Sequence, residues 1–207
     1  MPRIRDPQPL VRRAVYATLS TMGIKKHLHK SIVAALLIGV GFSTPLAADS
    51  ERLDLLFEQL LEAEPQEVDR IEQEIMLEWG KTGSAAMDLL YRRGEDAMEA
   101  GTPEVAVEHF TALVDHAPDF AEGYNGRASA YYQLGLIGPA IDDLRQVLVL
   151  EPRHFGAMTG VAVVLEEIGR PRDALEVWQR VAEFVPNDPD VIATIERLQV
   201  ILGGEAL

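Results

Sequence analysis

Histidines and paired acidic residues are the side chains in this sequence that could carry acid–base chemistry or bind a metal. Of the five histidines, His27 and His29 lie in a basic stretch near the N-terminus, and His109 and His116 stand seven residues apart in one expected helix. A zinc-type site needs further ligands that converge from elsewhere, and this spacing supplies none. We interpret His109 and His116 as surface histidines.

The other side chains that could act in catalysis stand at positions that do not favour it. His154 follows a proline at an expected turn. Asp142 and Asp143 are adjacent in an expected helix, so their side chains diverge by about 100° and cannot act together on one substrate, and the same holds for Glu166 and Glu167. The sequence has no cysteine, no glycine-rich phosphate loop and no Gly-x-Ser-x-Gly elbow. We predict a non-enzymatic protein without metal or cofactor.

The elements that carry these residues follow a repeat of 34 residues, which runs three times between Met87 and Asp188. Because proline makes up about 5% of residues, chance would place proline at the same position of two further repeats only about once in 400 cases. The three columns in phase are Gly101, Gly135 and Gly169; Ala106, Ala140 and Ala174; and Pro118, Pro152 and Pro186.

Each repeat has the pattern of two helices and a stop. Apolar and small residues recur every three or four positions on both sides of the glycine. A glycine just past the first helix can cap it in the left-handed conformation, and the proline cannot continue the second helix. Small residues alternate with large ones, as two helices crossing at close range require. No sustained alternation predicts a strand, so we expect an all-α fold.

At these residues the chain resembles the tetratricopeptide repeat family, whose 34-residue unit contains Ala-x-x-x-Phe and a closing proline. Tyr124 to Pro152 is the best match, and Ala106-x-x-x-Phe110 carries the same signature. The resemblance covers about half the chain and implies a short right-handed α-solenoid of three helix-turn-helix units. Arg93 and Arg127 depart from the family pattern, which usually has an apolar residue there. A second departure lies late in the second helix of each unit, where the family usually has a small residue and this chain has a larger one: Leu113, Val147 and Val181.

The N-terminal residues 1–48 have the composition of a secretory signal peptide. A basic start precedes an 11-residue apolar run, Ile32–Phe42, and a small-residue end. We expect cleavage between Ala48 and Asp49, with translation from Met22, and therefore a periplasmic or secreted protein. An uncleaved anchor is the alternative, but spanning a bilayer takes roughly 20 apolar residues. The Arg-rich start also permits an organelle transit peptide.

The mature chain expected after cleavage is strongly acidic. It holds 12 Lys and Arg against 32 Asp and Glu, a net charge of −20. Such a charge disfavours nucleic acid and anionic membrane surfaces and attracts basic partners, although a solvated acidic surface explains it equally well. With no cysteine, stability must come from helix packing rather than disulfides.

Segments before and after the repeats complete the predicted organisation. Leucine-rich residues ahead of the repeats form two helical stripes out of phase with them, which we interpret as a degenerate repeat or a cap. The alternative is an association surface for a second subunit. The predicted parts are an N-terminal extension with signal peptide (1–48), a helical hairpin (49–83), three repeats (87–120, 121–154 and 155–188) and a capping helix with a frayed tail (189–207).

The resemblance places a peptide-binding groove along the first helix of each unit. This groove is polar, aromatic and acidic with almost no basic residue, so we expect a protein or peptide partner that is basic or neutral there. We predict an exported adaptor in cell-envelope assembly, a monomer rather than a homo-oligomer; a self-associating structural element is the alternative. The predicted groove residues are Tyr91, Glu95, Met98, Glu99, Asn125, Ser129, Tyr132, Gln133, Val163 and Glu166.

Overall fold

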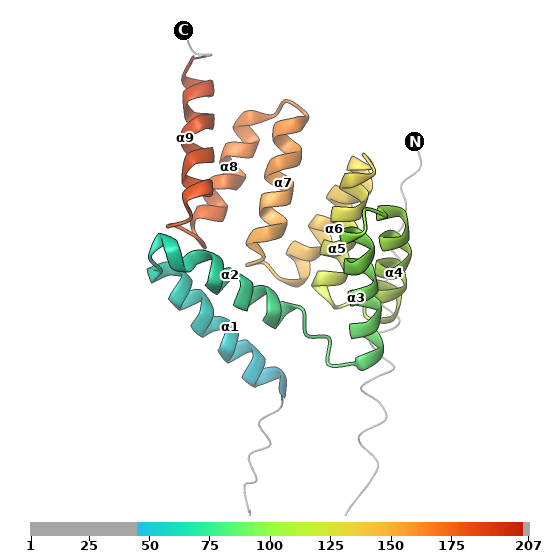
Figure 1. Cartoon of the computed structure of the whole chain (residues 1–207). Coiled ribbons are helices and arrows are strands. Elements are labelled where there is room, and N and C mark those ends of the chain that lie inside the picture. Colours follow the sequence, from blue (N-terminus) through green and yellow to red (C-terminus); the bar gives the residue numbers. More distant parts are fainter. Residues whose placement is uncertain (1–44, 205–207) are drawn as a thin grey trace, which may run out of the picture. The chain divides into compact units, whose positions relative to one another are not determined.

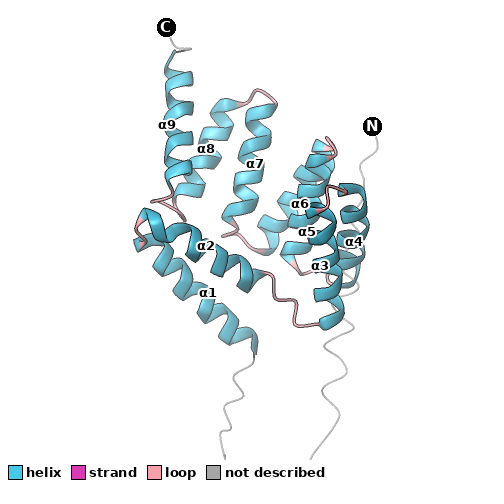
Figure 2. Cartoon of the chain, viewed as in Figure 1, coloured by secondary structure: helices cyan, strands magenta, loops and turns pink. Residues whose placement is uncertain are grey.

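Helical hairpins followed by one final helix make up the described part of the protein (Figure 1). The structure, a computed structural model, describes residues 45–204, which belong to one compact unit, Ser43–Leu207. Within these residues every regular element is a helix (Figure 2), which confirms the all-α prediction. The helices are α1 (Pro45–Glu62), α2 (Pro65–Trp79), α3 (Ala85–Glu99), α4 (Pro103–His116), α5 (Ala121–Gln133), α6 (Ile137–Leu150), α7 (Phe155–Glu167), α8 (Pro171–Ala182) and α9 (Pro189–Gly204).

The turn inside each repeat is built on the glycine that the repeat predicts. Gly101, Gly135 and Gly169 have φ angles of 69°, 71° and 74°, which only glycine adopts without strain. After α3, the backbone N–H of Thr102 donates to the carbonyl oxygen of Ala97 at 2.9 Å, and equivalent bonds follow α5 and α7. This capping arrangement satisfies carbonyl groups that the helix end leaves free. The predicted register is therefore confirmed.

The helix crossings are filled as the alternation of small and large residues predicts. Ala106, Ala140 and Ala174 have no exposed surface. In the first unit the ring of Phe110, which is 1% exposed, lies between α3 and α5. A Cβ on Gly94 or on Gly126 would approach this ring to 2.5 Å, so both helices need glycine at these positions.

The hairpin α1–α2 covers the third unit instead of the first unit, which follows it directly in sequence. Phe57 of α1 packs against Phe155 and Phe184, with ring centroids 6.3 and 6.1 Å apart. The Asn187 side chain donates to the carbonyl oxygen of Ala63 at 2.8 Å. Figure 1 shows α2 extending from the region of α8 and α9 towards the start of α3. The hairpin shares one apolar core with α7, α8 and α9, and α9 is the helix that packs alongside α8 (Figure 1).

The leucine-rich stripe of α1 is used within the chain. Leu56 and Leu60 have no exposed surface, and both belong to the core shared with the third unit. From Glu51 to the end of α1, the leucines that remain exposed are Leu55 and Leu61. Leu56 and Leu60 are therefore not available for self-association while the hairpin is in place, and the predicted alternative would have to use exposed members of the stripe such as Leu61.

The predicted signal peptide lies almost wholly outside the described residues. Its expected cleavage point, between Ala48 and Asp49, falls near the start of α1, which begins at Pro45. Within residues 45–204, no helix has both the length and the apolar character that crossing a bilayer requires.

Candidate functional site

The second and third units enclose a cavity of about 370 Å³, here named the inter-unit cavity. Helices α5 and α7 form its sides and α6 forms its floor. Five predicted groove residues line it: Asn125, Ser129, Tyr132, Gln133 and Val163. Thr159, which the resemblance also places on the inner face of the third unit, lines it as well. The remaining lining residues are not among those predicted for the groove: Ala128, Ala140, Leu144, Gly156, Gly160 and Val164.

Two glycines one helical turn apart open the α7 side of this cavity. Gly156 and Gly160 both lie on its wall. A Cβ on Gly160 would lie 3.2 Å from the Leu144 side chain, and one on Gly156 would lie 3.1 Å from the Met76 methyl group. The i, i+4 spacing of these glycines was the signal in the sequence that could have revealed this wall.

The inter-unit cavity combines an apolar floor with oriented polar groups. The Asn125 amide donates to Glu122 at 2.9 Å, and the Ser129 hydroxyl donates to the Asn125 carbonyl oxygen at 3.1 Å. The Tyr132 hydroxyl donates to Glu167, which raises the pKa of this tyrosine. Binding pockets for small or extended ligands have this character, with apolar walls and a few placed hydrogen-bonding groups.

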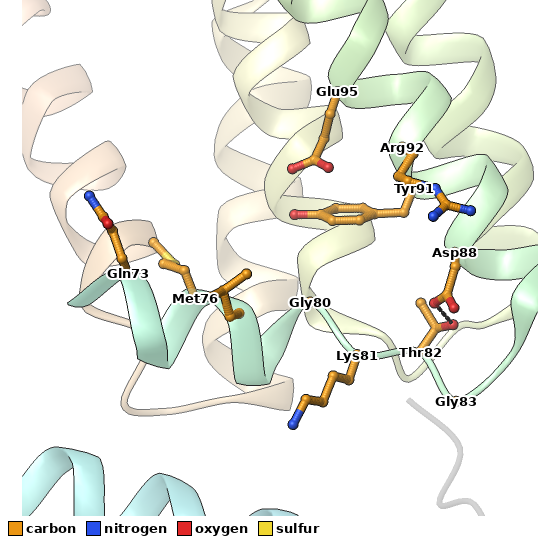
Figure 3. A pocket seen from close by; sticks show the side chains of 11 residues that line it. Gln73, Met76, Gly80, Lys81, Thr82, Gly83, Asp88, Tyr91, Arg92 and Glu95 are labelled. Carbon is orange, nitrogen blue, oxygen red and sulfur yellow. Dashed lines mark hydrogen bonds between the residues drawn. The ribbon is translucent and has the colours of Figure 1, made fainter. Parts of the chain in front are cut away.

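A second, larger cavity of about 1060 Å³ lies between α2 and α3, and we name it the hairpin cavity. The predicted residues Tyr91 and Glu95 line it, and Figure 3 shows both side chains directed towards α2. Lys81 and Arg92 also line it. The expectation of a groove almost without basic residues therefore needs correction on this side, because the α2–α3 linker brings Lys81 to the wall.

Negative charge gathers around Tyr91. Burial raises the pKa of the Tyr91 hydroxyl, and the carboxylates of Glu122 and Glu95 raise it further. Burial also raises the pKa of Glu95. The hydrogen bond with Tyr91 lowers this pKa in part, and the nearby carboxylate of Glu122 raises it. Burial, the larger cause, disfavours the charged form of both groups, and the neighbouring carboxylates make a further negative charge at this position unfavourable.

Three predicted groove residues do not line either of these cavities. Met98 is partly buried and packs in the core of the first unit, and Glu99 is exposed at the end of α3. Glu166 accepts hydrogen bonds from the Trp178 indole at 2.9 Å and from Arg197 at 2.7 Å. These partners come from α8 and α9, so Glu166 stabilises the contact between the third unit and the final helix.

A buried hydrogen-bonded histidine joins α5 to the start of α7 and stacks against α2, and no motif in the sequence signals it. His154 is fully buried, accepts at Nδ1 from the Ala157 backbone at 3.0 Å, and lies with Nε2 2.9 Å from Glu122. Since Nδ1 accepts, the proton of the neutral ring is on Nε2 and donates to Glu122. Trp79 stacks on the imidazole with ring centroids 4.3 Å apart. His154 is thus the N-cap of α7, not only a turn residue.

Arg127, which departs from the family pattern, has a partner inside the second unit. Its guanidinium binds Asp143 through two hydrogen bonds of 2.7 and 2.8 Å and also donates to Thr111 at 3.3 Å. The hydrogen bonds to Asp143 raise the pKa of Arg127. Paired groups of this kind satisfy charges that burial would otherwise penalise. The adjacent Asp142 instead pairs with Arg145 at 3.1 Å, so the two aspartates diverge as predicted.

The described residues hold no group of three His, Cys, Asp or Glu side chains that could bind a metal ion. His116 is exposed and His109 is partly buried, both on α4. Neither lines the inter-unit cavity or the hairpin cavity.

The fold and the two cavities define a class of protein, an α-solenoid of helical hairpins with a recessed inner face. The family model described as "Tetratricopeptide repeat" matches residues 91–141. A TPR repeat-containing protein of Rhizobium etli is 33% identical over 159 residues, which span 76% of this chain and 78% of the relative. The chain belongs to the tetratricopeptide repeat family.

Solved structures with low sequence identity share the fold. The first TPR of Spaghetti (RPAP3), bound to an HSP90 peptide, is 20% identical with a TM-score of 0.53, and the match covers 56% of this chain and 93% of that one. The Yersinia enterocolitica type III secretion chaperone SycD, in complex with a peptide of the translocator YopD, is 18% identical with a TM-score of 0.53. That match covers 56% of this chain and 95% of the chaperone chain.

Proposed function

We propose that this protein is a non-enzymatic adaptor that holds an extended or helical segment of a partner protein against the inner face of its repeats. The inter-unit cavity carries this proposal, because it offers an apolar floor beside the hydrogen-bonding groups of Asn125 and Ser129. A partner side chain can fill the floor while those groups bind its backbone. Two proteins of the same fold were solved with a peptide, which supports the same use.

The adaptor is proposed to act outside the cytoplasm, in assembly of the cell envelope. The basic start, the short apolar run and the small-residue end of residues 1–48 support export by a signal peptide. N-terminal sequencing of protein purified from the exporting cell tests this part. A start at Asp49 is expected, and a start at Met1 or Met22 would contradict export with cleavage.

Site-specific photo-crosslinking tests the adaptor role. A photoreactive amino acid at Ser129, on the wall of the inter-unit cavity, should capture one defined partner in the producing cell. The matched control places the same group at Glu108, an exposed residue of α4 that lines neither cavity. The crosslinked product of Ser129 and the partner should disappear when Asn125 and Tyr132 are replaced by alanine. Equal capture from Ser129 and Glu108 would show that the inner face has no special role.

A further inference from the structure

The hairpin cavity is formed in part by a segment that is outside the repeats. Helix α2 contributes Met76 and Leu77, and α3 contributes Tyr91 and Glu95. Leu77 is 70% exposed, so this wall presents an unusual amount of apolar side chain to solvent. A repeat array without this hairpin would lack the wall, because α2 and the linker after it are what face α3 here.

The carboxylate of Glu95 is a charged group of this cavity that no cation of residues 45–204 neutralises. It forms no ion pair within 4 Å in this part of the chain, whereas Lys81 pairs with Glu78. Asp88 accepts a hydrogen bond from Thr82, and Figure 3 shows Arg92 directed away from the Tyr91 ring. Glu95 and the Tyr91 hydroxyl point into the same space, towards the apolar wall on α2 (Figure 3).

This combination has the chemistry of a site for a long basic side chain. The aliphatic stem of a lysine or arginine packs on apolar surface while its charged end stays near a carboxylate. A cation near an aromatic ring gains further attraction from the ring face. Burial raises the pKa of Glu95, and the neighbouring carboxylates of Glu122, Glu99 and Asp96 add to this effect, so an arriving cation would stabilise the charged form.

We propose that the hairpin cavity is a subsite for a lysine or arginine side chain of the bound partner, with Glu95 and Tyr91 binding the cation and α2 supplying the apolar wall. The inference rests on the proposed function, because it assigns this subsite to the partner segment that we propose for the inter-unit cavity. It assigns the N-terminal hairpin a part in recognition as well as in packing.

Fluorescence anisotropy with a defined probe tests the subsite. The probe is a labelled amphipathic peptide of leucine and lysine, about four helical turns long, compared at about 0.15 M salt with the same peptide carrying glutamate in place of lysine. The lysine peptide should bind the protein and the glutamate peptide should not. Glu95→Gln should weaken binding about tenfold, as expected for loss of one charged hydrogen bond. Leu77→Ser should weaken it about threefold, since it removes part of the apolar wall.

The matched control is Glu104→Gln, which makes the same charge change on exposed α4, away from both cavities. It should leave affinity within about twofold, because Glu104 lines neither cavity and contributes only to the net charge. Equal weakening by Glu95→Gln and Glu104→Gln, or no binding of the lysine peptide, would overturn the subsite. Thermal unfolding of each variant checks that the fold is retained.

The crosslinking experiment separates this inference from the proposed function. If Ser129 still captures its partner and Glu95→Gln has no effect on capture or on probe binding, the adaptor role stands and the subsite is wrong. If Ser129 captures nothing while the lysine peptide still binds in a Glu95-dependent manner, the subsite stands and the adaptor role fails.

Discussion

The first two repeats and the third repeat solve the same packing problem in different ways. One residue position, four after the buried alanine, holds Phe110, Leu144 and Trp178 in the three units. Phe110 fits between the glycines of α3 and α5, and Leu144 meets Gly160 at the start of the next unit. Trp178 instead belongs to the core that α1, α2 and α9 complete.

The difference shows that the protein has two packing regions rather than one uniform stack. In the first region, α3 to α6, the large residue of each unit fits against glycines, which lie on α3 and α5 for Phe110 and on α7 for Leu144. In the second, α7 to α9 with α1 and α2, aromatic rings from distant parts of the sequence form the core. The inter-unit and hairpin cavities are both lined by residues of the two regions together. The candidate site therefore lies where the packing rule changes.

Replacing Phe110 by alanine is the strongest test of the first region. The ring is 1% exposed and contacts two helices, so its removal should lower the free energy of unfolding by about 3–5 kcal/mol. Urea unfolding measures the loss, and hydrogen exchange locates it. Protection should fall in α3 to α5 before it falls in α7 to α9.

Val149→Ala is the control for this substitution, because Val149 is exposed on α6 and should change stability by less than about 0.5 kcal/mol. A uniform loss of protection along residues 45–204 would instead show that the two regions unfold as one cooperative unit.

Substitutions at the buried alanines sharpen the comparison further. Ala106→Leu should overfill its crossing and cost about 1–3 kcal/mol, because Ala106 is fully buried in the core of the first unit. Ala140 is equally buried but lines the inter-unit cavity. Ala140→Leu should therefore be less costly than Ala106→Leu and should weaken partner capture from Ser129. Thermal unfolding and crosslinking measure the two effects; equal costs with unchanged capture would contradict this role of the cavity.

The repeats were predictable from sequence because their packing is local and periodic. Glycine with a positive φ, a buried alanine and a closing proline recur with the chain register, so Gly101 and Ala106 could be placed from the repeat alone. The inter-unit cavity was found in part for the same reason, since Asn125 and Ser129 lie on the inner face of one helix.

The rest of the site depends on contacts between residues far apart in the chain. No periodicity connects Ala63 with Asn187, whose hydrogen bond joins the hairpin to the third unit. Glu166 occupies an inner-face position in the repeat, yet Trp178 and Arg197 turn it towards α8 and α9. The final helix carries one partner of Glu166, and only the folded structure brings the two together.

A carboxyl group at the contact between the hairpin and the third unit gives the smallest and most specific prediction. Burial, with Asp188 and Asp69 nearby, raises the pKa of Glu72 from 4.5 to about 7. The proton is therefore held more tightly in the folded state. The stability that the protonated Glu72 contributes to the folded state is fully present below pH 4.5 and is lost as the pH rises through about 7. Because Glu72 is only half-buried, we expect the loss to be about 1 kcal/mol.

Glu72→Gln should remove this dependence, leaving stability at about pH 5 nearly unchanged and raising it at about pH 8 by about 1 kcal/mol. Urea unfolding at both pH values measures the effect, and hydrogen exchange should place the gain in α1 and α2. The control is Glu58→Gln on the exposed side of α1, which makes the same charge change away from Asp188. If both variants change the pH dependence equally, the effect comes from net charge. A separate response at Glu72 would show that the hairpin is held to the third unit by a contact that weakens as the pH rises, in contrast to the apolar crossing that Phe110 forms in the first region.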